Sequence, residues 1–139
     1  MGTSINPSRT GLDDILAHIL VVEDDEFLGP TIQAILEGAD FTTSLAVNGQ
    51  EAVKQLEGNA FDCIVSDLQM PIMTGIELLK WVHQNKPLPF VLMTGFIDEA
   101  TQQMVLSTGA PVILNKPFPP GVLEDTVQKA IDNKLKSAV

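Results

Sequence analysis

Short apolar segments rich in β-forming residues alternate with longer segments of helical periodicity along most of this chain. Apolar runs of this length are too short for a helix and are typical of parallel strands that are buried on both faces. The predicted strands cover residues 19–22, 41–47, 63–65, 90–93 and 112–114. This alternation is the strongest constraint on the fold, because a strand, a helix and a second strand in succession form a crossover within one parallel sheet.

The segments between the strands carry apolar residues at helical spacing. Leu28, Ile32, Ile35 and Leu36 form one face of a first helix, which Gly38 ends. The other predicted helices carry their inward faces at Ala52, Val53 and Leu56, at Ile76, Leu79, Val82 and His83, at Ala100, Met104 and Val105, and at Leu123, Val127, Ala130 and Ile131.

Capping and stop signals set the bounds of several helices. Asn48, followed three residues later by Glu51, indicates the start of the second helix. The fourth helix is predicted to begin near Asp98 and to end at Gly109, and the last helix to run to about Lys136.

Five strands alternating with five helices indicate an α/β fold, namely a flavodoxin-like (βα)5 doubly wound parallel sheet with strand order 2-1-3-4-5. A length of 139 residues suits a single domain. We expect that domain at residues 18–136, after an N-terminal extension or linker at 1–17 and before a tail at 137–139. Residues 11–18 fit either a short helix or a linker.

The chain is acidic. Eight Lys and Arg residues against eighteen Asp and Glu residues give a formal charge of -10 at pH 7, which opposes direct binding to nucleic acid or to an anionic membrane surface. The single cysteine, Cys63, allows no internal disulfide and favours a reducing setting. No apolar stretch reaches the ~18 residues of a membrane span, and no export signal opens the chain. We therefore expect a cytoplasmic protein that does not contact the membrane.

Polar residues stand where the predicted strands end. Residues 23–26 follow the first strand, Asp67 the third, Thr94 the fourth and Lys116 the fifth. Each has an ordinary explanation by itself, because acids favour a helix start, an aspartate caps a turn and a lysine lies on the surface. The predicted fold brings these strand ends to one edge, where clustered carboxylates repel unless they are protonated or bridged by a cation. Oxygen ligands of this kind suit Mg²⁺.

Four short motifs occur in order along the chain, namely Leu20-Val21-Val22-Glu23-Asp24, Ser66-Asp67 with Met70-Pro71 and Gly75, Met93-Thr94-Gly95 and Lys116-Pro117-Phe118. Together they resemble the receiver domains of two-component response regulators, over residues 18–136. The resemblance implies a signalling switch that assists its own phosphorylation and dephosphorylation, rather than an enzyme.

The resemblance implies roles for three side chains. Asp67 would accept a phosphoryl group from the phosphohistidine of a histidine kinase or a histidine phosphotransfer protein. Thr94 would hydrogen-bond the phosphoryl group, and Lys116 would pair with it. The peptide bond between Lys116 and Pro117 is often cis in the family, an isomer that the proline makes accessible.

The resemblance also implies a Mg²⁺ site. Asp24 would bind Mg²⁺ directly and Glu23 through water. Asp67 and the main-chain carbonyl of Gln69 would complete the protein ligands, and Gly75 would serve the turn into the third helix.

One position departs from the family pattern. Ile113 stands three residues before Lys116, where many members carry Tyr or Phe, so the aromatic ring that usually reports phosphorylation is absent or altered. No output domain is expected after the last helix. Output would therefore act through an unidentified partner, and phosphorylation-dependent dimerisation is left open.

Two origins remain open: a stand-alone receiver, or a receiver excised from a hybrid sensor histidine kinase, with residues 11–18 as residual linker. A structural pseudo-receiver would lack the acceptor or the acids, and both are present. A flavodoxin would need a phosphate loop where residues 23–26 are acidic. A phosphatase with a nucleophilic aspartate would carry a second aspartate where Gln69 stands.

Overall fold

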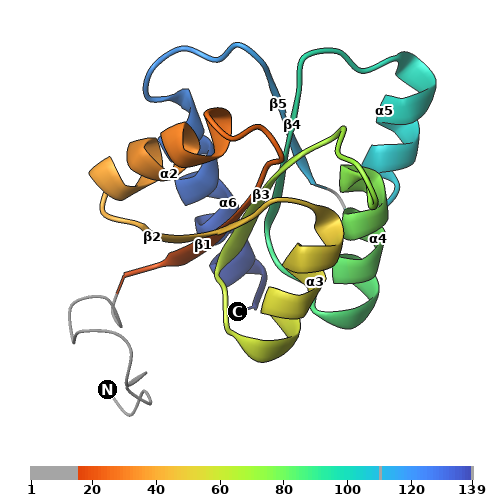
Figure 1. The fold of residues 1–139 in the computed structure, drawn as a ribbon. Coiled ribbons are helices and arrows are strands. Elements are labelled where there is room, and N and C mark those ends of the chain that lie inside the picture. The colour runs from red at the N-terminus through yellow and green to blue at the C-terminus, as the bar shows by residue number, and fades with distance from the viewer. Residues whose placement is uncertain (1–15, 110, 139) are drawn as a thin grey trace.

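The computed structural model describes residues 16–109 and 111–138 and contains a five-stranded parallel sheet (Figure 1). The strand order β2-β1-β3-β4-β5 confirms the predicted flavodoxin-like topology. Most of the predicted N-terminal extension, residues 1–15, lies outside the described part of the chain. The strands are β1 (His18–Val22), β2 (Thr42–Ala46), β3 (Cys63–Asp67), β4 (Phe90–Thr94) and β5 (Val112–Asn115).

Helices cover both faces of the sheet. Helices α2 and α6 pack on one face, and α3, α4 and α5 pack on the other (Figure 1). None of the helices within residues 16–138 is long and apolar enough to cross a membrane. They are α2 (Leu28–Gly38), α3 (Gly49–Gly58), α4 (Gly75–Asn85), α5 (Glu99–Leu106) and α6 (Val122–Ala138).

The central strands supply both halves of the core, because successive strand residues point to opposite faces. In β1, Leu20 and Val22 pack under α3 and α4, whereas Ile19 and Val21 pack under α2 and α6. Burial on both faces explains the uninterrupted apolar runs of the sequence. Cys63 of β3 belongs to the same core, and burial raises the pKa of its thiol to about 12. The thiol therefore stays protonated and unreactive at neutral pH.

Side-chain caps begin three of the helices. Asn48 accepts a hydrogen bond from the main-chain N–H of Glu51 at 2.8 Å, which confirms the predicted start of α3. Asp98 caps α5, also as predicted. The sequence interpretation missed the capping box of α4, in which Thr74 and Glu77 each accept a hydrogen bond from the other's main-chain N–H.

The predicted inward face of α5 is confirmed at Val105 and wrong at Ala100 and Met104. Ala100 and Met104 are exposed, and Val105 is the one buried residue of the helix. Helical spacing aligns Val105 with Thr101 and Thr108, and both threonines are partly buried. The inward face thus carries a single aliphatic side chain between two threonines, so a search for apolar periodicity finds Val105 but adds the exposed Ala100 and Met104 in place of the threonines.

Two smaller differences concern α4 and β2. His83 of α4 was predicted to face inward but is exposed, while Leu78, which the pattern missed, is fully buried. The second strand was predicted to reach Val47 but ends one residue earlier, and the Val47 side chain is 46% exposed.

Gly75, the first residue of α4, lies against the end of β3. Its main-chain N–H donates to the carbonyl of Leu68 at 2.8 Å. A Cβ atom added at Gly75 would lie 2.3 Å from the main-chain oxygen of Asp67 and 2.9 Å from the Cα of Leu68. Close approach of two backbones therefore explains this glycine better than the conformation of a turn.

Replacing Gly75 by alanine should destabilise the fold by about 1 to 3 kcal/mol, because the backbone at the end of β3 must move to admit a methyl group. Gly58→Ala is the matched control, since a Cβ atom at Gly58 meets nothing within 4 Å. The control should be neutral or slightly stabilising. Urea unfolding measures both, and equal stability of the two variants would contradict the close approach.

Candidate functional site

The carboxyl ends of four parallel strands lie along one edge of the sheet, and each carries a polar residue. Glu23 directly follows β1, and Asp67 is the last residue of β3. Thr94 is the last residue of β4, and Lys116 directly follows β5. The register aligns these ends, since Asp67 lies opposite Met93, the residue before Thr94.

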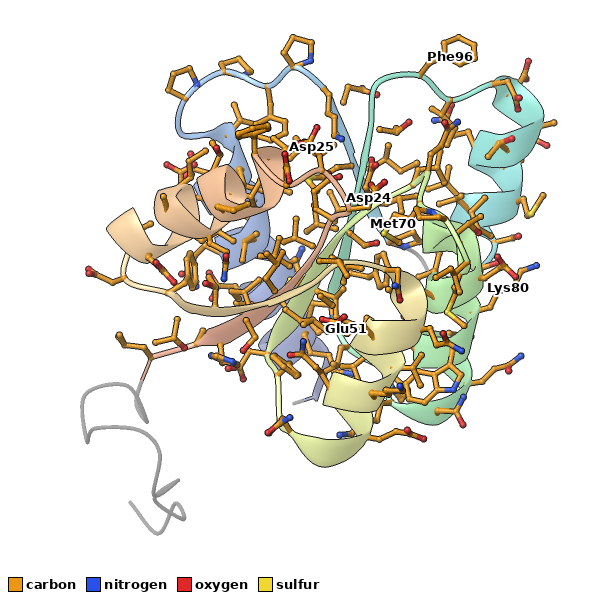
Figure 2. All side chains as sticks on the ribbon, in the orientation of Figure 1. Asp24, Asp25, Glu51, Met70, Lys80 and Phe96 are labelled. Atoms are coloured by element: carbon orange, nitrogen blue, oxygen red, sulfur yellow. The ribbon has the colours of Figure 1, made fainter. Side chains whose placement is uncertain are left out.

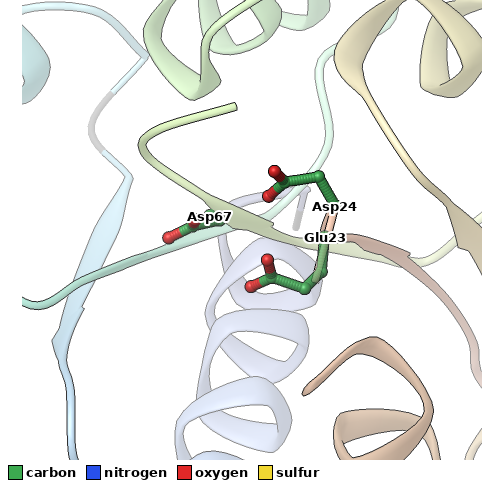
Figure 3. A group of neighbouring side chains, drawn as sticks. All are labelled: Glu23, Asp24 and Asp67. Carbon is green, nitrogen blue, oxygen red and sulfur yellow. The ribbon is translucent and has the colours of Figure 1, made fainter. Parts of the chain in front are cut away.

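Three carboxylates gather at this edge (Figure 3). Glu23, Asp24 and Asp67 each contribute an oxygen atom that lies within 4.8 Å of the other two. The Glu23 side chain is 2% exposed, Asp67 is partly buried, and Asp24 lies at the surface. The cluster is therefore buried on the side of Glu23 and open to solvent on the side of Asp24.

Asp25, the next residue of the acidic run, serves a different purpose. Its Oδ1 atom accepts hydrogen bonds from the main-chain N–H groups of Phe27 and Leu28, at 2.8 and 2.9 Å. These bonds lower the pKa of Asp25 and satisfy donors at the start of α2, near which Figure 2 locates this side chain. The helix-start interpretation of the acidic run thus holds for Asp25, while Glu23 and Asp24 join Asp67.

Lys116 supplies the positive charge of the cluster. Its Nζ atom donates to Oδ1 of Asp67 at 3.0 Å and to Oε1 of Glu23 at 3.4 Å. The main-chain N–H of Lys116 donates to the carbonyl of Thr94 at 2.8 Å, and the peptide bond to Pro117 is cis. One ammonium therefore bridges two carboxylates from different strand ends.

Burial and the neighbouring charges change the ionisation of both partners. Burial, together with repulsion from Asp67, raises the pKa of Glu23 against the opposing effects of Lys116 and of the main-chain N–H of Asp25. Burial alone would lower the pKa of Lys116, but its hydrogen bonds and ion pairs with Asp67 and Glu23 outweigh that effect and raise the pKa. Lys116 thus remains charged at neutral pH.

The Thr94 hydroxyl is engaged by the main chain two residues further on. Its Oγ1 atom donates to the carbonyl of Phe96 at 2.6 Å and accepts from the N–H of Phe96 at 3.2 Å. The Thr94 side chain is 3% exposed. The hydroxyl lies at the predicted strand end, but its recorded hydrogen bonds are to Phe96 rather than to Asp67.

Gln69 and Ser66 flank Asp67 in the chain. Gln69 is exposed in the loop that leads to α4, and the role of its main-chain carbonyl as a ligand stays a prediction. Ser66 was not predicted to contribute, yet its buried hydroxyl donates to the main-chain oxygen of Asp67 at 2.9 Å. A serine inside a buried strand is the signal that could have indicated this support.

The donor atoms fit a divalent cation. Glu23, Asp24 and Asp67 offer hard oxygen ligands, and the open side beside Asp24 leaves room for water. Three carboxylates against the single ammonium of Lys116 leave an excess of negative charge, which a cation would neutralise.

Comparisons with known proteins match most of this chain. Residues 19–128 match the family model described as the response regulator receiver domain. The transcriptional regulatory protein FixJ of Bradyrhizobium diazoefficiens is 36% identical over 115 residues, which are 82% of this chain and 56% of FixJ. The transcriptional regulatory protein ZraR of Salmonella typhimurium is 35% identical over 114 residues, which are 81% of this chain and 26% of ZraR. The chain therefore spans about half of the first relative and a quarter of the second.

Solved structures resemble the whole domain. The chemotaxis protein CheY4 of Vibrio cholerae matches with a TM-score of 0.77 and 32% identity, covering 83% of this chain and 98% of CheY4. The signal receiver domain of a signal transduction histidine kinase from Syntrophus aciditrophicus matches with a TM-score of 0.78 and 31% identity, covering 84% of this chain and 91% of that domain.

The raised pKa of Lys116 has a consequence for stability. Pairing of its ammonium stabilises the fold fully below the ordinary lysine pKa of 10.5, and this contribution is lost as the pH rises through the raised value. Lys116→Met should therefore lower the free energy of unfolding by about 1 to 3 kcal/mol at neutral pH and still unfold cooperatively. The difference from the wild type should shrink above pH 10.5, as measured by urea unfolding.

Lys80→Met is the control for this experiment. Lys80 is an exposed lysine of α4 that points away from the site (Figure 2). It should change stability little at any pH. Equal losses in the two variants, or a Lys116→Met difference that does not shrink at alkaline pH, would contradict the pairing.

Proposed function

This chain belongs to the response regulator receiver domain family, and on that premise we propose that Asp67 accepts a phosphoryl group in a Mg²⁺-dependent reaction that switches a partner-binding surface. The observation that carries the proposal is the grouping around Asp67. The Lys116 ammonium lies 3.0 Å from its Oδ1 atom, and oxygens of Glu23 and Asp24 lie within 4.8 Å of an Asp67 oxygen.

The proposed phosphodonor is the phosphohistidine of a histidine kinase or a histidine phosphotransfer protein. Asp67 attacks phosphorus as a carboxylate, so an O–P bond forms while the N–P bond of phosphohistidine breaks. The electron pair of the broken bond stays on the imidazole nitrogen. Because the nucleophile is already ionised, the reaction needs no general base and depends on positioning and charge neutralisation.

Glu23, Asp24, Asp67 and the main-chain carbonyl of Gln69 would hold Mg²⁺. The ion, when bound, would neutralise charge on the phosphoryl oxygens. Lys116 contributes a second positive charge, and its ammonium can move from Oδ1 of Asp67 to a phosphoryl oxygen. The domain thereby assists its own phosphorylation and dephosphorylation and acts as a switch rather than as an enzyme with a separate substrate.

Thr94 would donate its hydroxyl hydrogen to the phosphoryl group. In the unphosphorylated domain that hydrogen is donated to the carbonyl of Phe96, at 2.6 Å. A phosphoryl oxygen is the stronger acceptor because it is charged. Phosphorylation would therefore release the main chain after β4.

This receiver domain could belong to either of two kinds of full-length protein. Relatives named as transcriptional regulatory proteins support a regulator whose output lies in another domain or partner. The likeness to the receiver of a signal transduction histidine kinase supports a hybrid kinase. In either kind of protein, the formal charge of -10 argues against direct nucleic-acid binding by this chain. We propose a cytoplasmic location for it.

Asp67→Asn tests the acceptor. Wild-type protein incubated with acetyl phosphate and Mg²⁺ should gain one phosphoryl group by intact mass, and a chelator should prevent the gain. Asp67→Asn should gain none, because the amide is not a nucleophile of comparable strength.

Asp62→Asn is the matched control, because Asp62 precedes the same strand at its opposite end and is exposed. Its amide keeps an oxygen that can accept from the N–H of His18. This variant should be phosphorylated like the wild type. Undiminished phosphorylation of Asp67→Asn would refute the assignment of the acceptor.

Asp24→Asn tests the metal ligands. It should weaken Mg²⁺ binding by about tenfold or more, because a charged ligand is lost. Glu26→Gln removes one charge from the same acidic run at an exposed position outside the cluster and should weaken binding much less. Titration calorimetry compares them. Equal losses would mean that Mg²⁺ responds only to overall charge.

A further inference from the structure

A cleft of about 240 Å³ lies beside the acidic site, between the start of α4 and the start of α5. Its apolar lining includes Leu68, which is buried, and Ile76 and Ile97, which are partly buried. Phe96 borders the same cleft, but its side chain is 75% exposed and points away from the sheet (Figure 2). An exposed phenyl ring thus stands next to an apolar space large enough for it, since a cavity of roughly 150 Å³ binds benzene.

Two of the polar side chains that line this cleft, Thr74 and Asp98, already cap the helices. The Thr74 hydroxyl accepts from the N–H of Glu77 at 3.2 Å, at the start of α4. The Asp98 carboxylate accepts from the N–H of Thr101 at 2.7 Å, at the start of α5. Because the caps use the polar atoms of Thr74 and Asp98, the walls formed by Leu68, Ile76 and Ile97 favour an apolar occupant over a polar ligand.

The main chain of Phe96 is held by a single side chain. The Thr94 hydroxyl bonds both its carbonyl and its N–H. These two bonds fix the loop in the shape that points the ring to solvent. Any acceptor that draws the Thr94 hydroxyl toward Asp67 removes the bond to the Phe96 carbonyl and frees the loop.

The neighbouring strand offers no ring that could move instead. Ile113 of β5 packs, partly buried, on the same core cluster as Ile97. Its side chain is aliphatic and shorter than that of Tyr or Phe, so it cannot reproduce the movement of the aromatic ring that many family members carry at this position. In the loop after β4, Phe96 is the aromatic residue bonded to the Thr94 hydroxyl.

We propose that Phe96 is the moving aromatic of this domain, and that its ring folds into the cleft lined by Leu68, Ile76 and Ile97 when Asp67 is phosphorylated. The proposal rests on the proposed function of Asp67. Withdrawal of the Thr94 hydroxyl releases the loop, and burial of the phenyl ring favours the closed state. The exposed ring then leaves the surface beside the site, and the gap between α4 and α5 is filled.

The coupling runs in both directions, because a state favoured by phosphorylation must favour phosphorylation in turn. The closed ring frees the Thr94 hydroxyl for the phosphoryl group, whereas the open ring leaves it bonded to Phe96. A partner that recognises the exposed ring would therefore bind the unphosphorylated domain, and one that recognises the filled surface would bind the phosphorylated domain.

Methyl NMR of the whole chain tests the movement directly. Trifluoroberyllate with Mg²⁺ serves as the phosphoryl mimic, and isoleucine methyl groups are the probes. In the wild type, the mimic should produce nuclear Overhauser contacts from the Phe96 ring to the Ile76 and Ile97 methyl groups, together with upfield ring-current shifts. Phe96→Leu should lose the upfield shifts. Phe27→Leu, at a residue that is 77% exposed on the α2 side, should keep them.

Thr94→Val tests, without the phosphoryl mimic, whether the hydrogen bonds from the Thr94 hydroxyl hold the loop at Phe96. Loss of the hydroxyl should release the loop, so the contacts from Phe96 to Ile97 should appear in the unmodified protein. If these contacts stay absent, the hydrogen bonds of the Thr94 hydroxyl are not what holds the Phe96 ring in solvent.

Intact mass after acetyl phosphate treatment separates this inference from the function of the site. A phosphorylated wild type whose Phe96 ring makes no contact with Ile76 or Ile97 in the mimic-bound state would overturn the inference alone. A protein that takes up no phosphoryl group would overturn the proposed function and the inference together.

Discussion

The bridge from the Lys116 ammonium to Asp67 and Glu23 is the interaction on which the arrangement of this site depends. Glu23 is almost fully buried, and burial of a carboxylate next to a second carboxylate is unfavourable without a counter-charge. The ammonium supplies that charge from β5, across the edge of the sheet. Because the bridge is only partly buried and Asp24 stays open to solvent, the cluster can admit a cation or a phosphoryl group without unfolding.

The backbone around Asp67 is held more tightly than its side chain. Gly75 packs against its main-chain oxygen, and the Ser66 hydroxyl donates to the same atom. A rigid support beneath a charged, rearrangeable group is the arrangement that phosphoryl transfer requires, because positioning supplies much of the catalysis. The part that we propose to move lies one strand away, where the Thr94 hydroxyl is hydrogen-bonded to the main chain of Phe96.

Much of the fold follows from local patterns, because strands buried on both faces have continuous apolar sequences and the topology of crossovers is restricted. That topology is enough to bring Asp67 and Lys116 to one edge. The inward face of α5 was predicted correctly only at Val105, because its neighbours on that face are two threonines, which a search for apolar residues does not select. The acidic run was correctly linked to a helix start, but the sequence did not single out Asp25 within it. The bonding of the Thr94 hydroxyl was missed, because it depends on a loop conformation that strand and helix periodicity does not encode.

We propose that the reacting carboxylate is Asp67, at the end of β3. Borohydride reduction of the phosphorylated protein tests it most directly, because an acyl phosphate on aspartate is reduced to homoserine, and peptide mass spectrometry then identifies the position. We expect homoserine at residue 67, formed only after treatment with both phosphodonor and Mg²⁺. Reduction at Asp24 or Glu23 with residue 67 left as aspartate would contradict it.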